Sequence, residues 1–337
     1  MTDFKWGIIG PGSIASDFAK DLEFADEQRQ RVTAVLSRSE EHAKEFSTEF
    51  NVPFYTTDLY RFVNEGGMDA VYIATPHAQH YQYAITCLQH QIPVLCEKPL
   101  ALNQYQVREL IFTATSNKTF LMEGMWVRFL PSTHEILSRL PEIGNITSIK
   151  ARLSYRAPHD KEHQRFFDPE LGGGSLLDLG IYPVFLTFLL LGKPTQIKAV
   201  GKLSLKSVDE GCAAVLKYAG SQYAIIESSL IDELDHHAYV YGEKGYIKIF
   251  PPWNEKPEKI ELHIYNGETT MLPVEWNGKG LHFEASEVVR CLRDSKLDSS
   301  TFAAQASLDI MEIMDEIRKQ IGVVYKADEM LIDKQSL

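Results

Sequence analysis

Residues 5–15 read KWGIIGPGSIA, and this stretch decides the fold of the N-terminal half of the chain. The apolar run at 5–10 predicts a buried strand, and SIASDFAKDLEF at 13–24 predicts a helix directly after it. The glycines between them follow the spacing of dinucleotide-binding turns, with alanine in the third place. One glycine permits the tight turn, the next lets the backbone approach a pyrophosphate, and the helix N-terminus supplies unpaired N–H groups. We therefore predict cofactor binding by Gly10, Pro11, Gly12, Ser13, Ile14 and Ala15.

Strand and helix patterns continue to alternate as far as residue 126. Further strands are predicted at 31–39, 68–76, 92–98 and 119–126, and further helices at 39–50, 77–90 and 102–117. Such alternation is typical of a parallel, doubly wound α/β sheet. We therefore predict a Rossmann domain over residues 1–123.

The pattern changes after Trp126. A helix at 129–140 is followed by strand patterns at 147–156, 195–205, 212–219, 221–230, 237–242, 245–250 and 259–265, separated by turn signals, which predict an antiparallel meander. Helical spacing returns at the C-terminus. We predict that residues 124–337 form an α+β domain with a large, open, mainly antiparallel sheet that binds substrate and supports oligomerisation.

Composition excludes several classes of protein. The 337 residues carry a formal net charge of −12 without a basic and aromatic run, so we expect no nucleic-acid partner. The longest apolar run, at 182–192, is shorter than the ~20 residues of a membrane-spanning helix, so we expect no membrane partner and a cytoplasmic location. The four cysteines have no metal-binding spacing, and no acid or cysteine pattern completes the pairs His159 and His163 or His236 and His237. We expect no metal.

The end of the second strand indicates which dinucleotide binds. An acidic residue there would hold the ribose 2′-hydroxyl of NAD, but the chain has Ser37, Arg38 and Ser39. A guanidinium flanked by hydroxyls suits a 2′-phosphate, which favours NADP. The alternative is that Arg38 is a solvated surface charge and that NAD is used as well.

A second stretch, IPVLCEKPLALN at 92–103, ends a predicted buried strand on Glu97 and Lys98. Ligands of doubly wound sheets lie beyond the carboxyl ends of the strands, so Lys98 is expected to face the cofactor, and Pro99 restricts the chain that follows it. By geometry alone, Lys98 is equally well a lysine that merely leaves the sheet.

Several ordered motifs resemble the Gfo/Idh/MocA oxidoreductase family over essentially the whole chain. They are GPGSIA at 10–15, ATPHAQH at 74–80, CEKP at 96–99, GGGSLLDLGIYPV at 172–184 and the C-terminal helices at 280–294 and 310–325. The resemblance implies that Lys98 is catalytic and that Thr75, Pro76, His77 and Glu97 line the nicotinamide and its ribose. It also implies a cis peptide between Lys98 and Pro99.

The second signature departs from the family pattern, because Asp178 is kept but the usual histidine is replaced by Tyr182. The chain thereby resembles the NADP-dependent branch that acts on trans-dihydrodiols and some aldoses, as does LMEGMWVRFLP at 121–131. In that branch the Trp126 region borders the substrate, so Trp126 is expected to form either a stacking wall or a filler between domains. Asp178 and Tyr182, at i and i+4 of a helix, would both reach the substrate.

The resemblance predicts an NAD(P)-dependent enzyme that transfers a hydride between nicotinamide and a CH–OH group of a trans-dihydrodiol, sugar or polyol. A lysine cation ~4 Å from a tyrosine lowers its pKa by roughly three units at an effective dielectric near 20, so Tyr182 is one candidate base. A desolvated Lys98 is the other. A glycoside hydrolase using transient NAD oxidation and a non-catalytic dinucleotide sensor remain as alternatives. The second sheet, with apolar residues on both faces, predicts a homodimer or higher oligomer.

Overall fold

The computed structural model describes residues 3–158, 160, 163–233 and 235–329. The chain forms two compact units, and neither is continuous in sequence. The first contains residues 1–101, 105–129 and 276–308, and the second contains 102–104, 130–275 and 309–337. The boundary expected between 123 and 124 therefore falls inside one segment of the first unit, and a C-terminal segment returns to that unit.

The first unit is built on a six-stranded parallel sheet with strand order β3-β2-β1-β4-β5-β6. Its strands are β1 (Phe4–Ile9), β2 (Gln30–Leu36), β3 (Phe54–Thr56), β4 (Ala70–Ile73), β5 (Val94–Glu97) and β6 (Leu121–Gly124). The strands read as almost continuous apolar runs because helices cover both faces of the sheet. This order reverses direction between β1 and β4, where doubly wound folds bind their ligands.

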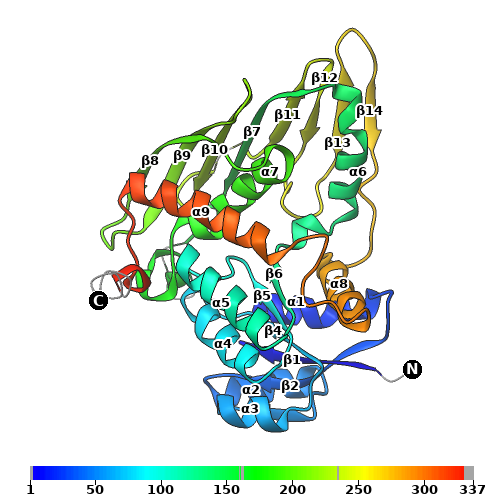
Figure 1. Cartoon of the computed structure of the whole chain (residues 1–337), viewed down its shortest axis with the longest axis vertical. Helices are drawn as coiled ribbons and strands as arrows, with labels where there is room; N and C mark the ends of the chain where they lie inside the picture. The colour runs from blue at the N-terminus through cyan, green and yellow to red at the C-terminus, as the bar shows by residue number, and fades with distance from the viewer. Residues whose placement is uncertain (1–2, 159, 161–162, 234, 330–337) are drawn as a thin grey trace. The chain divides into compact units, whose positions relative to one another are not determined.

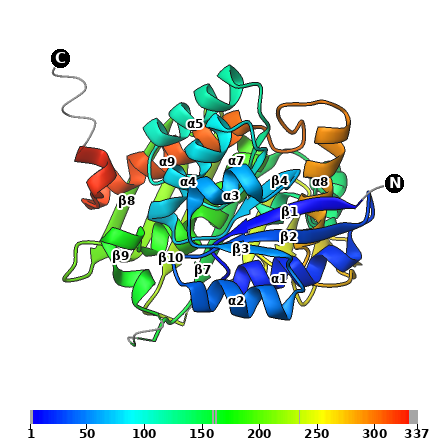
Figure 2. The same ribbon diagram turned by 90° about the horizontal axis from the view of Figure 1, so that it is seen from below.

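Helices lie on both faces of this sheet. In Figure 2, α1 (Ser13–Asp21) and α2 (Glu40–Glu49) lie on one face, and α3 (Leu59–Glu65), α4 (His77–Gln89) and α5 (Gln104–Ser116) lie on the other. The helix α8 (Leu281–Arg293) packs beside α1. The fold class predicted for this region is confirmed, although the short β3 and α3 carry too weak a pattern to have been predicted.

The second unit contains an eight-stranded sheet with strand order β14-β13-β12-β11-β7-β10-β9-β8 (Figure 1). Its strands are β7 (Ile146–Ser154), β8 (Gln196–Leu203), β9 (Asp209–Lys217), β10 (Tyr223–Ser229), β11 (Ala238–Gly242), β12 (Gly245–Ile249), β13 (Ile260–Ile264) and β14 (Thr269–Leu272). Both sequence-local groups, β8–β10 and β11–β14, are antiparallel meanders.

The sheet is not one continuous meander, because β7 lies between these two groups. It pairs in parallel with β10 and antiparallel with β11. The expectation of a large, mainly antiparallel sheet is thus confirmed, and the simple meander is corrected. Pairing of β7 with strands far along the chain leaves no local signal in the sequence.

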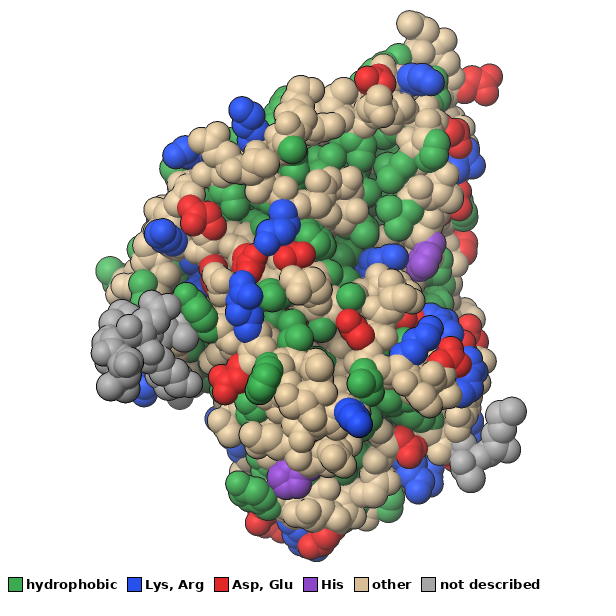
Figure 3. Space-filling view, in the orientation of Figure 1, with side chains coloured by type: hydrophobic (Ala, Val, Ile, Leu, Met, Phe, Trp, Pro, Cys, Tyr) green, Lys and Arg blue, Asp and Glu red, His purple; other side chains and the backbone are tan. Residues whose placement is uncertain are grey.

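Helices α6 (Pro131–Arg139) and α7 (Ile181–Leu191) pack on this sheet, and α9 (Ala304–Ile321) begins in the first unit and continues in the second. One stretch of the described residues, Pro169–Leu191, is long and apolar enough to cross a membrane, with a mean hydropathy of 1.8. Because 72% of it is buried inside the protein, it is placed as a core helix would be. On the face drawn in Figure 3, acidic and basic side chains of the described residues are interspersed.

Candidate functional site

The glycine turn after β1 has the backbone that its sequence predicts. Gly10 has φ +86°, a conformation that side chains disfavour, and a Cβ there would lie 2.7 Å from Thr75 Cγ2. Gly12 precedes α1, and a Cβ built on it meets no described atom within 4 Å. The first turn of α1 contains no acidic residue. The turn therefore leaves open space beside a helix N-terminus, which suits a pyrophosphate.

The three residues after β2 present a cation between two hydroxyls. Arg38 is exposed, and among the described residues it makes no hydrogen bond or ion pair. Ser37 Oγ accepts the Ser39 N–H at 3.3 Å, and Ser39 Oγ accepts the His42 N–H at the start of α2. Since both hydroxyls act as acceptors in these bonds, their hydrogens remain to be donated. The side chains of Ser37, Arg38 and Ser39 can therefore all donate hydrogen bonds to an anion.

The loop after β4 holds Thr75, Pro76 and His77. Thr75 Oγ1 is buried and has no hydrogen-bond partner among the described residues. Pro76 caps α4, and His77 is its buried first residue. An unpartnered buried hydroxyl costs free energy unless a ligand satisfies it, so Thr75 fits a cofactor contact.

His80 connects this loop to the loop after β5, which sequence reasoning had not foreseen. Its two ring nitrogens lie 2.8 Å from the carbonyl oxygens of Thr75 and Pro99, and the side chain is fully buried. Burial is the main cause that lowers the pKa of His80, to about 4. The neutral ring has one N–H and donates to only one of these carbonyls, but it lies against both segments, each of which carries predicted site residues.

Glu97 ends β5 and Lys98 follows directly after it, close to the predicted strand end, and the Lys98–Pro99 peptide is cis. The Tyr72 hydroxyl donates to Glu97 Oε1 at 2.5 Å, and the Lys98 N–H donates to Glu97 Oε2 at 3.2 Å. Lys98 is half-buried. The base of the lysine is thus fixed by a hydrogen-bonded carboxylate and by the loop that His80 holds.

Two further buried carboxyl groups lie near Glu97, and sequence patterns gave no signal for them. Glu123 lies on β6, next to its last residue, and its Oε1 accepts the Leu100 N–H at 2.9 Å. Burial raises the pKa of Glu123 to about 7. Glu284, on α8, is fully buried, and neither of its oxygens has a partner among the described residues.

In the second unit, the glycine-rich signature forms a tight loop followed by a helix. Gly174 has φ +126°, and a Cβ on Gly173 would lie within 2.8 Å of three backbone atoms of residues 165–168. Residues Leu176–Gly180 wind as a π-helix that continues into α7. The predicted helix is present, but Asp178 lies on a π turn, a feature often found at functional sites.

Asp178 and Tyr182 are both almost fully buried, at 8% and 6% exposure. Arg165 Nη1 lies 3.6 Å from Asp178 Oδ1, so a half-exposed cation lies beside this carboxylate. Asp209 and Tyr325 hydrogen-bond to the backbone of this loop. Asp209 Oδ2 accepts the Leu176 N–H at 2.7 Å, and the Tyr325 hydroxyl donates to the Gly173 carbonyl at 2.5 Å. Burial raises the pKa of Asp209 to about 7.

Trp126, on a short 3₁₀ turn after β6, belongs to the first unit. Its side chain is 9% exposed, and its indole N–H is buried without a partner among the described residues. An indole normally finds an acceptor when it is buried. This unused donor is what a substrate-facing tryptophan would offer.

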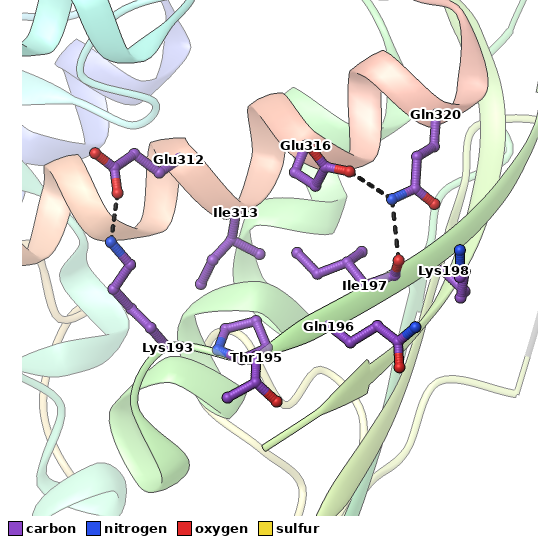
Figure 4. Close-up of a pocket in the computed structure, with 10 residues that line it drawn as sticks. Lys193, Thr195, Gln196, Ile197, Lys198, Glu312, Ile313, Glu316 and Gln320 are labelled. Atoms are coloured by element: carbon purple, nitrogen blue, oxygen red, sulfur yellow. Dashed lines mark hydrogen bonds and ion pairs between the residues drawn. The ribbon is translucent and has the colours of Figure 1, made fainter. Parts of the chain in front are cut away.

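One groove of the second unit contains none of the predicted site residues. It has a volume of about 430 Å³ and runs between the β8 edge and α9 (Figure 4). The Gln320 side chain pairs with the Ala199 N–H and the Ile197 carbonyl, so it covers the open edge of β8. Lys193 is paired with Asp309 and Glu312. His159 lies outside the described residues, within which no three His, Cys, Asp or Glu side chains converge to hold a metal.

Comparison with known proteins identifies the family. The family described as "Oxidoreductase family, NAD-binding Rossmann fold" matches residues 4–125, and the "GFO/IDH/MocA C-terminal domain" matches residues 139–248. The chain belongs to the Gfo/Idh/MocA oxidoreductase family. The predicted resemblance is confirmed, and this Gfo/Idh/MocA protein is an NAD(P)-dependent oxidoreductase with a Rossmann domain.

Curated relatives match this Gfo/Idh/MocA protein over nearly its whole length. Trans-1,2-dihydrobenzene-1,2-diol dehydrogenase of Xenopus laevis is 36% identical over 336 residues, which cover 95% of this chain and 99% of the relative. The mouse (Mus musculus) enzyme of the same name is 33% identical, with 96% and 99% covered. The scyllo-inositol 2-dehydrogenase (NADP(+)) IolU of Bacillus subtilis strain 168 is 34% identical, again with 96% and 99% covered.

Solved structures share the fold of this Gfo/Idh/MocA protein. Aldose-aldose oxidoreductase from Caulobacter crescentus superposes with a TM-score of 0.85 at 20% identity, covering 95% of this chain and 97% of that one. Levoglucosan dehydrogenase superposes with a TM-score of 0.83 at 15% identity, covering 95% and 98%. At these identities the likeness establishes the architecture of both units.

Proposed function

We propose that the protein is an NADP-dependent dehydrogenase that oxidises one secondary hydroxyl of a ring carrying trans-diol groups, such as a dihydrodiol, sugar or cyclic polyol. The observation that carries the choice of NADP is Arg38, exposed and unpaired among the described residues at the end of β2. The names of the dihydrodiol and inositol dehydrogenases that it resembles support the substrate class. NAD is the second cofactor to be tested.

The residues of the first unit fit such a cofactor. Its pyrophosphate would lie on the Gly10–Ala15 turn, its 2′-phosphate on Ser37, Arg38 and Ser39, and its nicotinamide half beside Thr75, Pro76, His77 and Glu97. The open space at Gly12 and the unpartnered Thr75 hydroxyl support this placement. A dinucleotide held by these residues would supply the acceptor for the hydride that leaves the carbon of the reacting hydroxyl.

The hydroxyl proton requires a base from the protein, and we propose that Lys98 and Tyr182 share this task. Either Tyr182 takes the proton while the Lys98 cation lowers the pKa of the phenol, or Lys98 takes it directly. Asp178 orients the substrate by accepting a hydroxyl hydrogen, and Trp126 contacts the ring through its face or its unused N–H.

The test is reduction of NADP and of NAD by the purified protein with trans-dihydrodiols, inositols, pentoses and hexoses. We expect turnover with at least one of these classes and a higher kcat/KM with NADP. Absence of turnover with every class would overturn the proposed substrate range. A higher kcat/KM with NAD would overturn the proposed cofactor.

The same preparation distinguishes the two alternatives. A hydrolase that uses transient oxidation needs a retained dinucleotide, which would be visible in the absorbance of the purified protein, and it would cleave glycosides without net cofactor reduction. A sensor would bind dinucleotide without turning over any substrate.

We also propose that the enzyme acts as a homodimer in the cytoplasm.

A further inference from the structure

Glu284 is a fully buried carboxyl group that no neighbouring donor stabilises in the described part of the chain. It lies on α8, at 0% exposure, and among the described residues neither oxygen accepts a hydrogen bond. A buried carboxylate without donors is costly, and such a group keeps its proton instead. The other buried acid of this helix, Glu287, has partners, because it accepts from the Ser299 hydroxyl and pairs with Arg290.

The position of Glu284 connects it to the end of β5. Glu97 on β5 is in register with Gly124 on β6. A Cβ placed on Gly124 would lie 3.5 Å from Glu284 Oε1, 3.4 Å from Glu97 Cα and 3.3 Å from the Cys96 carbonyl oxygen. The Glu284 carboxyl and the backbone of Glu97, the residue that precedes Lys98, therefore border the same small space beside Gly124, which a side chain at position 124 would fill.

The groups that interact electrostatically with Glu284 are acidic: Glu97 on β5, Glu123 on β6 and the Tyr72 hydroxyl on β4. Lys98, which follows β5, and Ser307, near the start of α9, act on Glu123. Burial, and then the charges of Glu97 and Glu123, raise the pKa of Glu284 well above its usual value. Three carboxylates could not all be ionised so close together.

The hydrogen bonds indicate which carboxyl keeps the charge. Glu97 accepts from the Tyr72 hydroxyl and the Lys98 N–H, so it is equipped as an anion. Glu123 has one oxygen satisfied by the Leu100 N–H. Glu284 accepts no hydrogen bond from a hydroxyl or from a backbone N–H among the described residues. Of the three carboxyl groups, it is therefore the one whose neutral form is favoured most.

We propose that Glu284 is a neutral carboxylic acid that donates its proton to the Glu97 carboxylate, and that it is thereby a positioning residue for Lys98. The functional half of this inference rests on the catalytic role proposed for Lys98. A neutral acid steadies Glu97 without adding a second negative charge behind the lysine. An ionised Glu284 would add that charge and push Glu97 away.

The first experiment compares the unfolding of wild type and Glu284→Gln from pH 5 to pH 8 and needs no substrate. A buried neutral acid must release its proton on unfolding, because the unfolded group titrates near ~4.3. The unfolding equilibrium constant of wild type should therefore rise about tenfold per pH unit relative to that of the variant. This rise should continue until the pH reaches the pKa of Glu284 in the folded protein. Glu123 and Asp209 are present in both proteins, so their contributions cancel.

Glu287→Gln is the matched control, because it removes a buried carboxyl from the same helix that already has an ion-pair partner. Its unfolding constant relative to wild type should not change systematically with pH. A ratio for Glu284→Gln that is also constant from pH 5 to pH 8 would show an ionised Glu284 and would overturn the proposal.

The second experiment measures turnover and NADP affinity of Glu284→Gln and Glu284→Leu. The amide can still donate to Glu97, so Glu284→Gln should keep at least a third of wild-type kcat, whereas Glu284→Leu should lose about tenfold with an NADP Kd within threefold. If both variants lose kcat equally, an ionised carboxylate is required at this position. If both keep wild-type kcat, Glu284 does not position Lys98. If the leucine variant does not fold, a tenfold loss in Glu284→Gln alone contradicts the proposal. Inactivity of the wild type would count against the proposed function and not against the pH-dependent unfolding.

Discussion

Arg38 lies at the carboxyl end of β2 between two hydroxyl side chains, and its chemistry suits a phosphate better than a ribose hydroxyl. We expect Arg38→Ala to raise the KM for NADP at least tenfold with little change for NAD, because a charge-assisted hydrogen bond contributes about 1.5–3 kcal/mol. Steady-state kinetics with both cofactors test this. Arg31→Ala, which removes an exposed arginine at the other end of the same strand, is the control. Equal effects of Arg38→Ala on the two cofactors would refute a phosphate site.

Lys98 is expected to be essential under both assignments of the base. Lys98→Met should abolish turnover while it leaves the NADP Kd within a few-fold, because the change removes the charge and the proton carrier but keeps a side chain of similar length. Rapid-mixing and equilibrium binding measurements test the two parts separately. Turnover above about a tenth of the wild-type value would mean that Lys98 only ends the strand.

Tyr182 decides which group is the base. If the phenol takes the proton, Tyr182→Phe should lower kcat at least a hundredfold and should remove the basic limb of its pH profile. A loss of less than tenfold with an unchanged profile would assign the base to Lys98. The measurement is kcat against pH for wild type and variant under saturating cofactor.

The residues of the candidate site were predictable where a local motif carries them. Glycine spacing, a charged strand end and a glycine-rich helix start are visible in a few consecutive letters, and the structure has a turn, a strand end and a helix start at these positions. Glu123, Glu284, Asp209 and Tyr325 were missed because their positions depend on contacts between residues far apart in the sequence. His80 was missed although it lies in a quoted motif, because its partners are backbone carbonyls that no pattern reveals.

At the scale of elements, one aspartate fastens the returning C-terminal segment to the Rossmann sheet. Asp21, at the end of α1, accepts the backbone N–H groups of Lys279, Gly280 and Leu281 at 2.7–2.9 Å, and these precede or begin α8. The N-cap residue of α8 is a glycine and offers no side chain. Asp21 therefore caps a helix that starts about 260 residues later in the chain.

This capping gives a prediction for stability. Burial alone would raise the pKa of Asp21, but the nearby His282 ring, whose Nδ1 lies 3.6 Å from Asp21 Oδ2, and the hydrogen bonds of the three backbone N–H groups outweigh it and hold the pKa below its usual value. Asp21→Ala should lower the unfolding free energy by about 2–3 kcal/mol at pH 7. Because the folded carboxyl has the lower pKa, this contribution is present above pH ~4 and is lost as the pH falls through the pKa of the folded state.

Denaturant unfolding at pH 7 and at pH 3 measures this difference. Asp17→Ala is the matched control, since Asp17 lies on the same helix and, within the described part of the chain, its one ion pair is a contact of 3.9 Å with the exposed Lys279. Such a surface pair contributes less than ~1 kcal/mol. An equal cost for the two variants at pH 7 would show that Asp21 is not a specific cap.

Elements with a strong local period were predictable, and those fixed by long-range pairing were not. The Rossmann strands and their long helices follow from apolar runs and helical spacing. The insertion of β7 between two meanders does not, because β7 pairs with β10 and β11, which lie far along the chain, and packs with β10 against α7. The π turn at Leu176–Gly180 is equally invisible, since its sequence is that of an apolar helix.

At the scale of the whole molecule, the eight-stranded sheet has one face that its own chain leaves partly uncovered. The register aligns Val215, Ile225, Lys150, Tyr239 and Lys248 in one row across five neighbouring strands. Val215 is 47% and Ile225 40% exposed, while the alternate residues of these strands are buried. Lysines in the row lie over neighbouring tyrosine rings, as at Lys150 and Tyr241. A partly exposed surface of this composition suits a symmetric interface with a second copy of the chain.

We therefore expect a homodimer that is held by this sheet face and disrupted by charge placed within it. Ile225→Lys would put a second ammonium beside Lys150, its partner in the register, and would desolvate it in an interface of roughly 1,200–2,000 Å². Light scattering at micromolar concentration should give a dimer mass for wild type and a monomer mass for the variant. Phe112→Lys, which changes a side chain that is 72% exposed on α5, should leave the dimer intact. A monomeric wild type would refute the interface, and a dimer that survives Ile225→Lys would place it on another surface.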